Sequence, residues 1–226
     1  MNLPDYWLPR PVQAFEAGAE QAFDRLLETT IRRGGQPTIG YHLPWPKWQF
    51  LCHLADRLEI VLHGSGDAEI EQFEPRQSND LNQFGNQKAI YAAGDGLWAM
   101  FFAIVDRPKV GSISNACIRL VDESGHSLGP YYVFSVSQSA LPTQPWRTGT
   151  VYLLPRATFT LQPPLTFGPY QVQIPQLASF VPVQPLAKLT VAPADFPFLG
   201  QIRGHDDQRL QEVADALQNG APWPED

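Results

Sequence analysis

The sequence predicts a single mixed α+β domain that begins with helices, continues as a β-rich region and ends with one helix. Apolar residues recur at three- and four-residue steps before position 57 and again after position 206, which is typical of amphipathic helices. Between positions 110 and 191, short β-branched or alternating runs are separated by Gly, Pro, Gln and Ser, which indicates strands. Without an internal repeat or a long polar linker, we expect an N-terminal helical lobe (residues 1–57) packed on a β-rich main part (residues 58–226) as one cooperative unit.

The composition is typical of a chain that folds on its own. Its hydrophobic fraction of 43% supplies a core, and its charged fraction of 17% is too low for a disordered chain. The formal net charge is -7 and Lys and Arg form no runs, which argues against general nucleic-acid binding but not against a small nucleotide. Cys52 and Cys117 lack a metal-ligand spacing, and we expect two buried thiols.

Neither a signal peptide nor a membrane helix is indicated. The first residues contain no basic region followed by an apolar stretch. The most apolar run, residues 97–105, is about half the length that a membrane helix requires. We therefore expect a cytoplasmic protein without a membrane partner.

Two helices are predicted before residue 58. The first follows Pro11 and is closed by Gly34-Gly35, and the second begins at Pro46 and ends near Arg57. The apolar positions that define them are Phe15, Ala19, Ala22, Phe23, Leu26, Leu27 and Thr30 for the first helix, and Trp48, Leu51, Cys52 and Ala55 for the second.

The next elements alternate strand and helix. A buried strand over residues 58–63 stops at Gly64-Ser65-Gly66, and residues 77–88 read as a polar surface loop. A short strand over residues 89–93 then leads into a buried helix over residues 97–104, for which Asp95 is the expected N-cap. Further strands are expected at residues 117–121, 131–136, 150–154, 170–174 and 181–191, and the last helix opens at Asp206-Asp207 with its apolar stripe at Leu210, Val213, Ala214 and Leu217.

His63 is the first candidate for a functional side chain. A histidine at the end of a buried strand, followed by glycines, would project into a cavity at the strand end, where the glycines let a ligand approach the backbone. The alternative is a histidine at the edge of the core that bonds a backbone carbonyl, with the glycines forming only a turn.

The order of elements around His63 resembles the ADP-ribosyltransferase superfamily, which includes NAD-dependent ADP-ribosyltransferases and RNA 2'-phosphotransferases. In that superfamily a strand ends in His-Gly-Ser or His-Gly-Thr, and a later strand carries an aromatic residue among small residues before a helix. His63-Gly64-Ser65 and Tyr91 match these two positions. The resemblance implies a β-rich split β-sandwich around a cleft that binds NAD, without a metal ion.

The resemblance also implies roles for individual residues. His63 would bond the adenosine-side ribose of NAD, the Gly64 backbone would contact the nicotinamide carboxamide, and Tyr91 would stack on the nicotinamide ring. Transferring members place a glutamate at the start of a late strand, where it stabilises positive charge on the sugar. The matching strand here is expected at residues 179–183 and begins with Ser179, so that Ser179 or Gln176 could orient a ribose but supplies no charge.

Charged residues near this candidate site have two interpretations each. Arg76 and Arg107 could bind nucleotide phosphates, or could form salt bridges with Glu74 and Asp106. The nearest acids are expected to be solvated surface charges or, for Asp95, a helix cap; they are Glu69, Glu71, Glu74 and Asp95. His205-Asp206-Asp207 resembles a metal trio, but adjacent positions at a helix start point in different directions.

Two functions from different classes remain open. The first is a protein that binds NAD or a related nucleotide and transfers ADP-ribose to a macromolecule such as a protein acceptor. The second is a catalytically degenerate interaction protein that uses the aromatic region from Tyr41 to Phe50 as its contact surface. If the aromatic rings of that region lie in the core instead, they join the helical lobe to the β-rich part.

Overall fold

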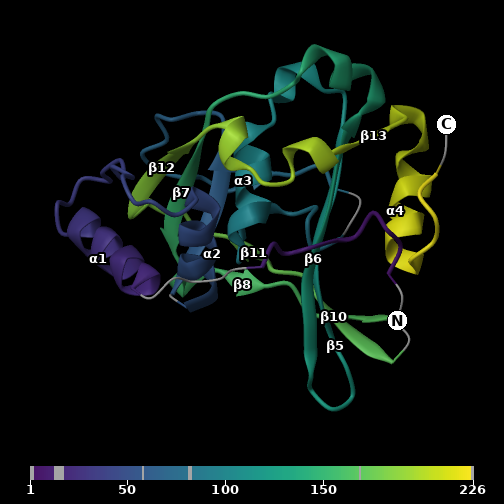
Figure 1. The fold of residues 1–226 in the computed structure, drawn as a ribbon, viewed down its shortest axis with the longest axis horizontal. Coiled ribbons are helices and arrows are strands. Elements are labelled where there is room, and N and C mark those ends of the chain that lie inside the picture. The colour runs from purple at the N-terminus through teal and green to yellow at the C-terminus, as the bar shows by residue number, and fades with distance from the viewer. Residues whose placement is uncertain (1–2, 13–17, 58, 81–82, 168, 225–226) are drawn as a thin grey trace.

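The computed structural model describes residues 3–12, 18–57, 59–80, 83–167 and 169–224. Within these ranges the chain forms four α-helices and two mainly antiparallel β-sheets (Figure 1). The helices are α1 (Ala19–Ile31), α2 (Lys47–Arg57), α3 (Gly96–Ile104) and α4 (Leu210–Asn219). The predicted mixed fold with a β-rich second half is therefore confirmed.

A seven-stranded sheet holds the strand that carries His63. Its neighbouring strands run in the order β12, β7, β2, β4, β11 and β8, and β3 pairs with β4 outside this path. The bounds of these strands are β12 Ala187–Val191, β7 Gly149–Pro155, β2 Ile60–Ser65, β4 Lys88–Ala93, β11 Gln176–Ser179, β8 Thr160–Leu161 and β3 Arg76–Gln77. In this sheet β2 is central, because β7 pairs with it on one side and β4 on the other.

A six-stranded sheet lies across the main core from the first. Its order is β1, β6, β5, β10 and β9, with β13 parallel to β6 outside this path. The bounds are β1 Leu8–Pro9, β6 Ser127–Ser137, β5 Ile113–Val121, β10 Tyr170–Gln173, β9 Leu165–Phe167 and β13 Arg203–His205. Phe101 of α3 packs against Phe134 of β6, with 4.8 Å between ring centroids, so α3 connects this sheet to the core.

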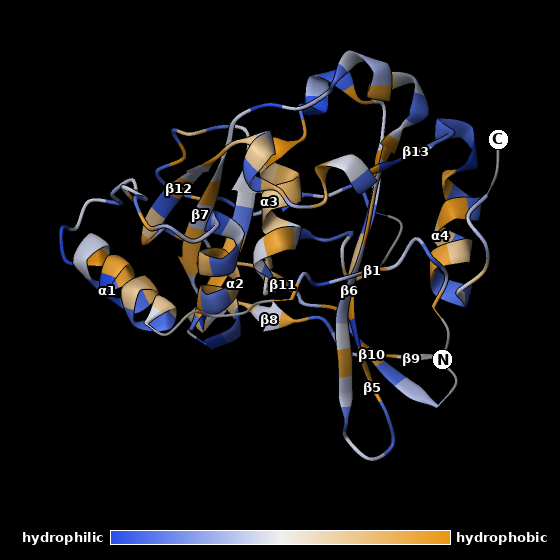
Figure 2. Cartoon of the chain, viewed as in Figure 1, coloured by the Kyte–Doolittle hydropathy of each residue, from blue (hydrophilic) through white to orange (hydrophobic). Residues whose placement is uncertain are grey.

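The buried helix α3 is the centre of the main core. Its side chains are apolar on nearly every side, which Figure 2 shows as orange along its length, and this pattern explains why it packs against β2, β7 and α2 at once. The helix α1 carries polar and apolar faces, and its Phe23 packs edge-on against Phe50 of α2. The helical lobe and both sheets therefore share one core.

A second apolar cluster covers the opposite face of the seven-stranded sheet. Because side chains alternate along a strand, Val61 of β2 and Ile90 of β4 point to this face, whereas Leu62 and Ala93 point to the main core. Phe73 closes the cluster through a backbone bridge to Val183.

Asp95 begins α3 as expected and has further partners. Its Oδ1 accepts a hydrogen bond from the backbone N–H of Trp98 at 2.9 Å. Its Oδ2 lies 2.6 Å from an Nη of Arg10 and accepts from the Tyr132 hydroxyl at 2.8 Å. This buried carboxylate therefore joins the start of α3 to β1 and β6.

Most predicted elements are confirmed, with three differences, one of which is the strand expected at residues 181–191: β12 forms only Ala187–Val191 of it. The strand expected at residues 58–63 begins at Ile60 and continues through Ser65, and Leu58 lies outside the described residues, as does Phe15 of the first helix. The strand expected at residues 179–183 is wrong: β11 covers Gln176–Ser179 and ends where that strand was expected to begin. Cys52 and Cys117 are free, buried thiols, as predicted, and burial raises the pKa of both.

The aromatic region from Tyr41 to Phe50 packs inward. Phe50 is buried, Tyr41 lies 5.5 Å from it between ring centroids, and Trp45 packs edge-on against Phe23. These rings join the helical lobe to the core, and Trp48 is buried with them. Separately, none of the helices in the described ranges is long and apolar enough to cross a bilayer.

Candidate functional site

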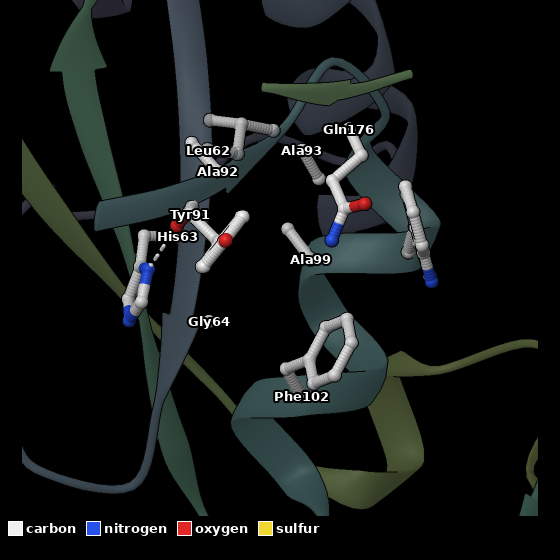
Figure 3. Close-up of a pocket in the computed structure, with 10 residues that line it drawn as sticks. Leu62, His63, Gly64, Tyr91, Ala92, Ala93, Ala99, Phe102 and Gln176 are labelled. Atoms are coloured by element: carbon white, nitrogen blue, oxygen red, sulfur yellow. Dashed lines mark hydrogen bonds between the residues drawn. The ribbon is translucent and has the colours of Figure 1, made fainter. Parts of the chain in front are cut away.

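A pocket of about 160 Å³ lies between β2, β4 and α3, at the place where the sequence predicted a site (Figure 3). The main-core face of the sheet supplies one wall and α3 the other. Its lining is mostly apolar and consists of Leu62, His63, Gly64, Tyr91, Ala92, Ala93, Trp98, Ala99, Phe102 and Gln176. Three of the residues with predicted site roles, His63, Gly64 and Tyr91, are therefore brought together here.

Gly64 allows α3 to lie directly on β2. A Cβ at this position would lie 2.0 Å from the carbonyl oxygen of Ala99 and 2.7 Å from the backbone nitrogen of Ala103, and any side chain would force the helix away. The absence of a side chain thus has a packing reason, and it also leaves the backbone of Gly64 at the pocket wall.

The His63 ring lies on the other face of the sheet. Figure 3 shows the ring on the side of β2 away from Phe102 and Gln176, and it packs 4.7 Å from the Phe73 ring in the second apolar cluster. Its Nδ1 is 2.7 Å from the backbone carbonyl oxygen of Tyr91. Burial lowers the pKa of His63, and the bond to the Tyr91 carbonyl opposes this shift in part.

The structure therefore corrects the expected direction of the His63 side chain. The sequence predicted a ring that projects into the cavity, and the alternative was a ring bonded to a backbone carbonyl. The geometry agrees with the alternative, because the pocket is on the main-core side and the His63 ring is on the side of the second cluster.

Tyr91 contributes its side chain to the pocket and is held by the loop before it. Its hydroxyl donates to the carbonyl oxygen of Phe84 at 2.9 Å and accepts from the backbone N–H of Gln87 at 2.9 Å. Burial raises the pKa of Tyr91, so the phenol is neutral around pH 7. These bonds fix the ring orientation and couple the polar loop of residues 83–88 to the pocket.

Gln176 forms the third side of the pocket. It is the first residue of β11 and pairs with Ala93 of β4, so its side chain shares the main-core face with Leu62 and Ala93. Its amide group points into the pocket in Figure 3 and makes no side-chain hydrogen bond with the described residues. The amide therefore offers a donor NH₂ group and an acceptor carbonyl oxygen to a bound molecule.

Three other predicted site residues do not line the pocket. Ser65 accepts a hydrogen bond from the N–H of Asp67 at 3.0 Å, which fixes the turn after β2. Ser179 is buried and donates to Thr158 Oγ1 at 3.0 Å, on the face opposite to Gln176. Arg76 is exposed on β3, which pairs with the far half of β4.

No carboxylate lines the pocket as the structure describes it. Glu69, Glu71 and Glu74 are exposed, in agreement with the expected surface positions. Asp95 is buried, but its oxygens are used by Arg10, Trp98 and Tyr132.

Neither expected salt bridge of Arg76 or Arg107 forms among the described residues. Asp106 lies 2.9 Å from Lys109 and 4.0 Å from Arg147 instead. His205 is buried and bonded to Ser112 and Ser135, and its Nε2 lies 3.6 Å from Asp207, whose carboxylate accepts from Ser112 and Ser137. The described residues contain no group of three His, Cys, Asp or Glu side chains placed to hold a metal ion.

Sequence reasoning missed Trp98 and Phe102 as pocket residues. Both were assigned to a helix that is buried on all sides, and the sequence carries no signal that separates the residues facing β2 from the rest. A close backbone contact such as that of Gly64 with Ala99 becomes visible only when the register of helix and strand is known.

Comparisons with known proteins identified no relative of this chain. The chain matches no family model, no curated protein and no solved structure. The geometry of the pocket and the residues that line it are therefore the basis for a functional proposal.

Proposed function

We propose that this chain has a split β-sandwich fold of the ADP-ribosyltransferase type and binds NAD or a related nucleotide, with the nicotinamide ring in the pocket between β2, β4 and α3. The observation that supports this proposal is the meeting of Gly64, Tyr91 and Gln176 on three sides of one small pocket. The resemblance in sequence involves only the first two of these residues, so Gln176 is additional support from the geometry.

The size of the pocket suits a single aromatic ring. A protein cavity of about 150 Å³ holds one benzene molecule, and this pocket is about 160 Å³. The Tyr91 and Phe102 rings at its walls favour a flat aromatic ligand. A carboxamide on that ring would find a complementary amide in Gln176.

Binding is better supported than ADP-ribose transfer. When nicotinamide leaves NAD with the electron pair of its bond to the ribose, positive charge develops on the sugar, and a nearby carboxylate would stabilise it. Gln176 lines the pocket with a neutral amide, which supplies no negative charge. We therefore propose nucleotide binding as the primary function and treat transfer to a protein acceptor as the part to be tested separately.

Calorimetric titration of the full chain with NAD tests the proposal. We expect binding to the wild type, and Tyr91→Ala should weaken it about fivefold to tenfold, because a stacked ring contributes about 1 kcal/mol. Tyr170→Ala, on β10 of the other sheet, is the matched control and should bind as the wild type does. A wild type that neither binds NAD nor binds nicotinamide would refute the proposal.

A further inference from the structure

The guanidinium group of Arg147 lies against the backbone of Gly66, just beyond the end of β2. A Cβ at Gly66 would lie 1.6 Å from Cζ of Arg147 and 1.8 Å from its Nη2. Only glycine leaves room for the guanidinium at this position. The second glycine of the Gly64-Ser65-Gly66 sequence therefore has a specific neighbour, which is a cation.

The charge of Arg147 is not closely paired. Its Nε is buried and has no hydrogen-bond partner among the residues that the structure describes. The nearest carboxylate oxygen, on Asp106, is 4.0 Å from Nη1, and the same carboxylate lies 2.9 Å from Lys109 through its other oxygen. Because the Arg147 side chain is 30% exposed, it remains accessible to an anion from solution.

A second arginine, Arg107, directly follows Asp106, whose carboxylate lies 4.0 Å from Arg147 and whose backbone N–H donates to the carbonyl oxygen of Pro145 at 2.9 Å. The pKa of Arg107 is lowered by burial and by the neighbouring charge of Arg147. Among the described residues, the Asp106 carboxylate pairs with Lys109 and Arg147, and Arg107 is left without an ion pair. Two like charges repel each other, and an anion bound between them would relieve that repulsion.

Arg147 lies beyond the two elements that form the pocket walls. Gly66 follows β2 at a bend, two residues after Gly64, and the backbone N–H of Arg147 donates to the carbonyl oxygen of Ile104, the last residue of α3, at 2.8 Å. Gly64 contacts α3 at the pocket wall, and Gly66 contacts Arg147. Since the pocket holds only one ring, the ribose and diphosphate of a dinucleotide must lie outside it.

We propose that Arg147, seated on Gly66, and the adjacent Arg107 form an anion subsite that binds the diphosphate of the nucleotide whose ring occupies the pocket. This inference rests on the proposed function and extends it by assigning the phosphate-binding residues. The guanidinium group is suited to this role, because its planar fork donates two parallel hydrogen bonds to phosphate oxygens.

Calorimetric titrations of the full chain with NAD, nicotinamide and inorganic pyrophosphate test the subsite. Arg147→Gln should weaken NAD binding about tenfold to a hundredfold, as expected for loss of a charge-assisted contact, and Arg107→Gln should weaken it less. Nicotinamide, which has no phosphate, should bind both variants and the wild type alike. Raising the salt concentration should weaken NAD binding to the wild type more than to Arg147→Gln.

Two further variants separate this effect from a general loss of structure. Arg156→Gln removes an arginine that follows β7, near the opposite end of β2, and should leave NAD binding unchanged. Gly66→Ala keeps both arginines but places a Cβ where the Arg147 guanidinium lies, so it should also weaken NAD binding. Circular dichroism checks that each variant is folded.

The outcomes distinguish the subsite from the proposed function. If NAD binds the wild type and folded Arg147→Gln equally well, the subsite is refuted and the proposed function stands. If the wild type binds pyrophosphate but neither NAD nor nicotinamide, and Arg147→Gln loses the pyrophosphate, the anion subsite stands and the proposed function fails. If the wild type binds none of the three, both are refuted.

Discussion

The Nδ1 atom of His63 lies 2.7 Å from the backbone carbonyl oxygen of Tyr91, and the two side chains occupy opposite faces of the same sheet. Since a carbonyl oxygen only accepts hydrogen bonds, Nδ1 is the protonated nitrogen of the ring. The ladder between β2 and β4 contains a single register pair, Leu62 with Ala93, so this side-chain bond extends the connection between the strands. His63 therefore contacts the backbone of Tyr91 in β4 and not its side chain.

Stability should decline in mild acid because of this half-buried histidine. The folded pKa of His63 is lowered by burial, whereas the unfolded chain has the ordinary value of about 6.5. Below that pH the unfolded state binds more protons, so the stability that is present above about pH 6.5 is lost as the pH falls, by at most about 1.4 kcal/mol per pH unit for this group.

Urea unfolding at pH 8 and at pH 5.5 measures this effect. His63→Asn keeps a donor for the Tyr91 carbonyl but cannot be protonated, so its free energy of unfolding should fall less between the two pH values than that of the wild type. His205, whose pKa is also lowered by burial, accounts for part of the remaining change. Equal slopes for wild type and His63→Asn would contradict the prediction.

Gly64→Ala should strongly destabilise the protein. The new Cβ would lie 2.0 Å from the Ala99 carbonyl oxygen, and relieving this overlap requires α3 to move away from β2, at a cost of about 1–3 kcal/mol or more. Gly200→Ala is the control, because no atom lies within 4 Å of a Cβ at that position. Thermal or urea unfolding compares the two, and a Gly64→Ala variant as stable as Gly200→Ala would show that α3 does not press on β2.

Asp95→Ala should lower the free energy of unfolding by about 3–5 kcal/mol. It removes the N-cap of α3 and the buried one of the two carboxylates that pair with Arg10, leaving only the more exposed Asp56, and breaking a buried ion pair from one side costs this much. Asp95→Asn keeps a good capping residue and should cost less. Glu59→Ala, at a 91% exposed carboxylate, should change stability by less than about 0.5 kcal/mol in the same unfolding assay.

Gln176→Glu tests whether the pocket supports ADP-ribose chemistry. The substitution changes the shape of the side chain little and adds a carboxylate to the wall of the pocket, beside the ring whose bond to the ribose breaks, so its negative charge would stabilise the positive charge that develops on the ribose outside. We expect release of nicotinamide from NAD to increase at least about tenfold, which corresponds to about 1.4 kcal/mol in the barrier. Chromatography of nicotinamide measures the rate. A Gln176→Glu variant that binds NAD as the wild type does but releases no more nicotinamide would contradict the expected chemistry.

The elements around the pocket could largely be predicted from the sequence. The β-branched run before His63, the short run around Tyr91 and the Asp95 cap are local signals, and each matches an observed strand or helix start. Local patterns predict well here because β2, β4 and α3 are buried elements with clear apolar runs.

The direction of His63 could not be predicted in the same way. Moving a strand by one residue turns every side chain to the other face, and a strand buried on both faces gives no alternation from which to choose. Val61 and Leu62 are both fully buried, on opposite faces of β2. The register therefore had to come from the pairing of β2 with β7.

Gln176 was named from the sequence as a residue that could orient a ribose, but its position at the start of a strand was not predicted. The run from Ser179 to Val183 is apolar and resembles a strand, but β11 begins three residues earlier because Gln176 pairs with Ala93. Arg147 had no local signal at all, since its contact with Gly66 joins positions that are distant in the chain.

The ion pair between Arg10 and Asp95 makes the helix that lines the pocket depend on the N-terminal segment around β1. Arg10 follows β1, and Asp95 sets the first turn of the helix that carries Trp98 and Phe102. Proteolytic trimming past residue 10 would remove the cation that balances this carboxylate, and would loosen α3 from a distance. Any shortened version of the chain prepared for ligand screening should therefore retain Arg10.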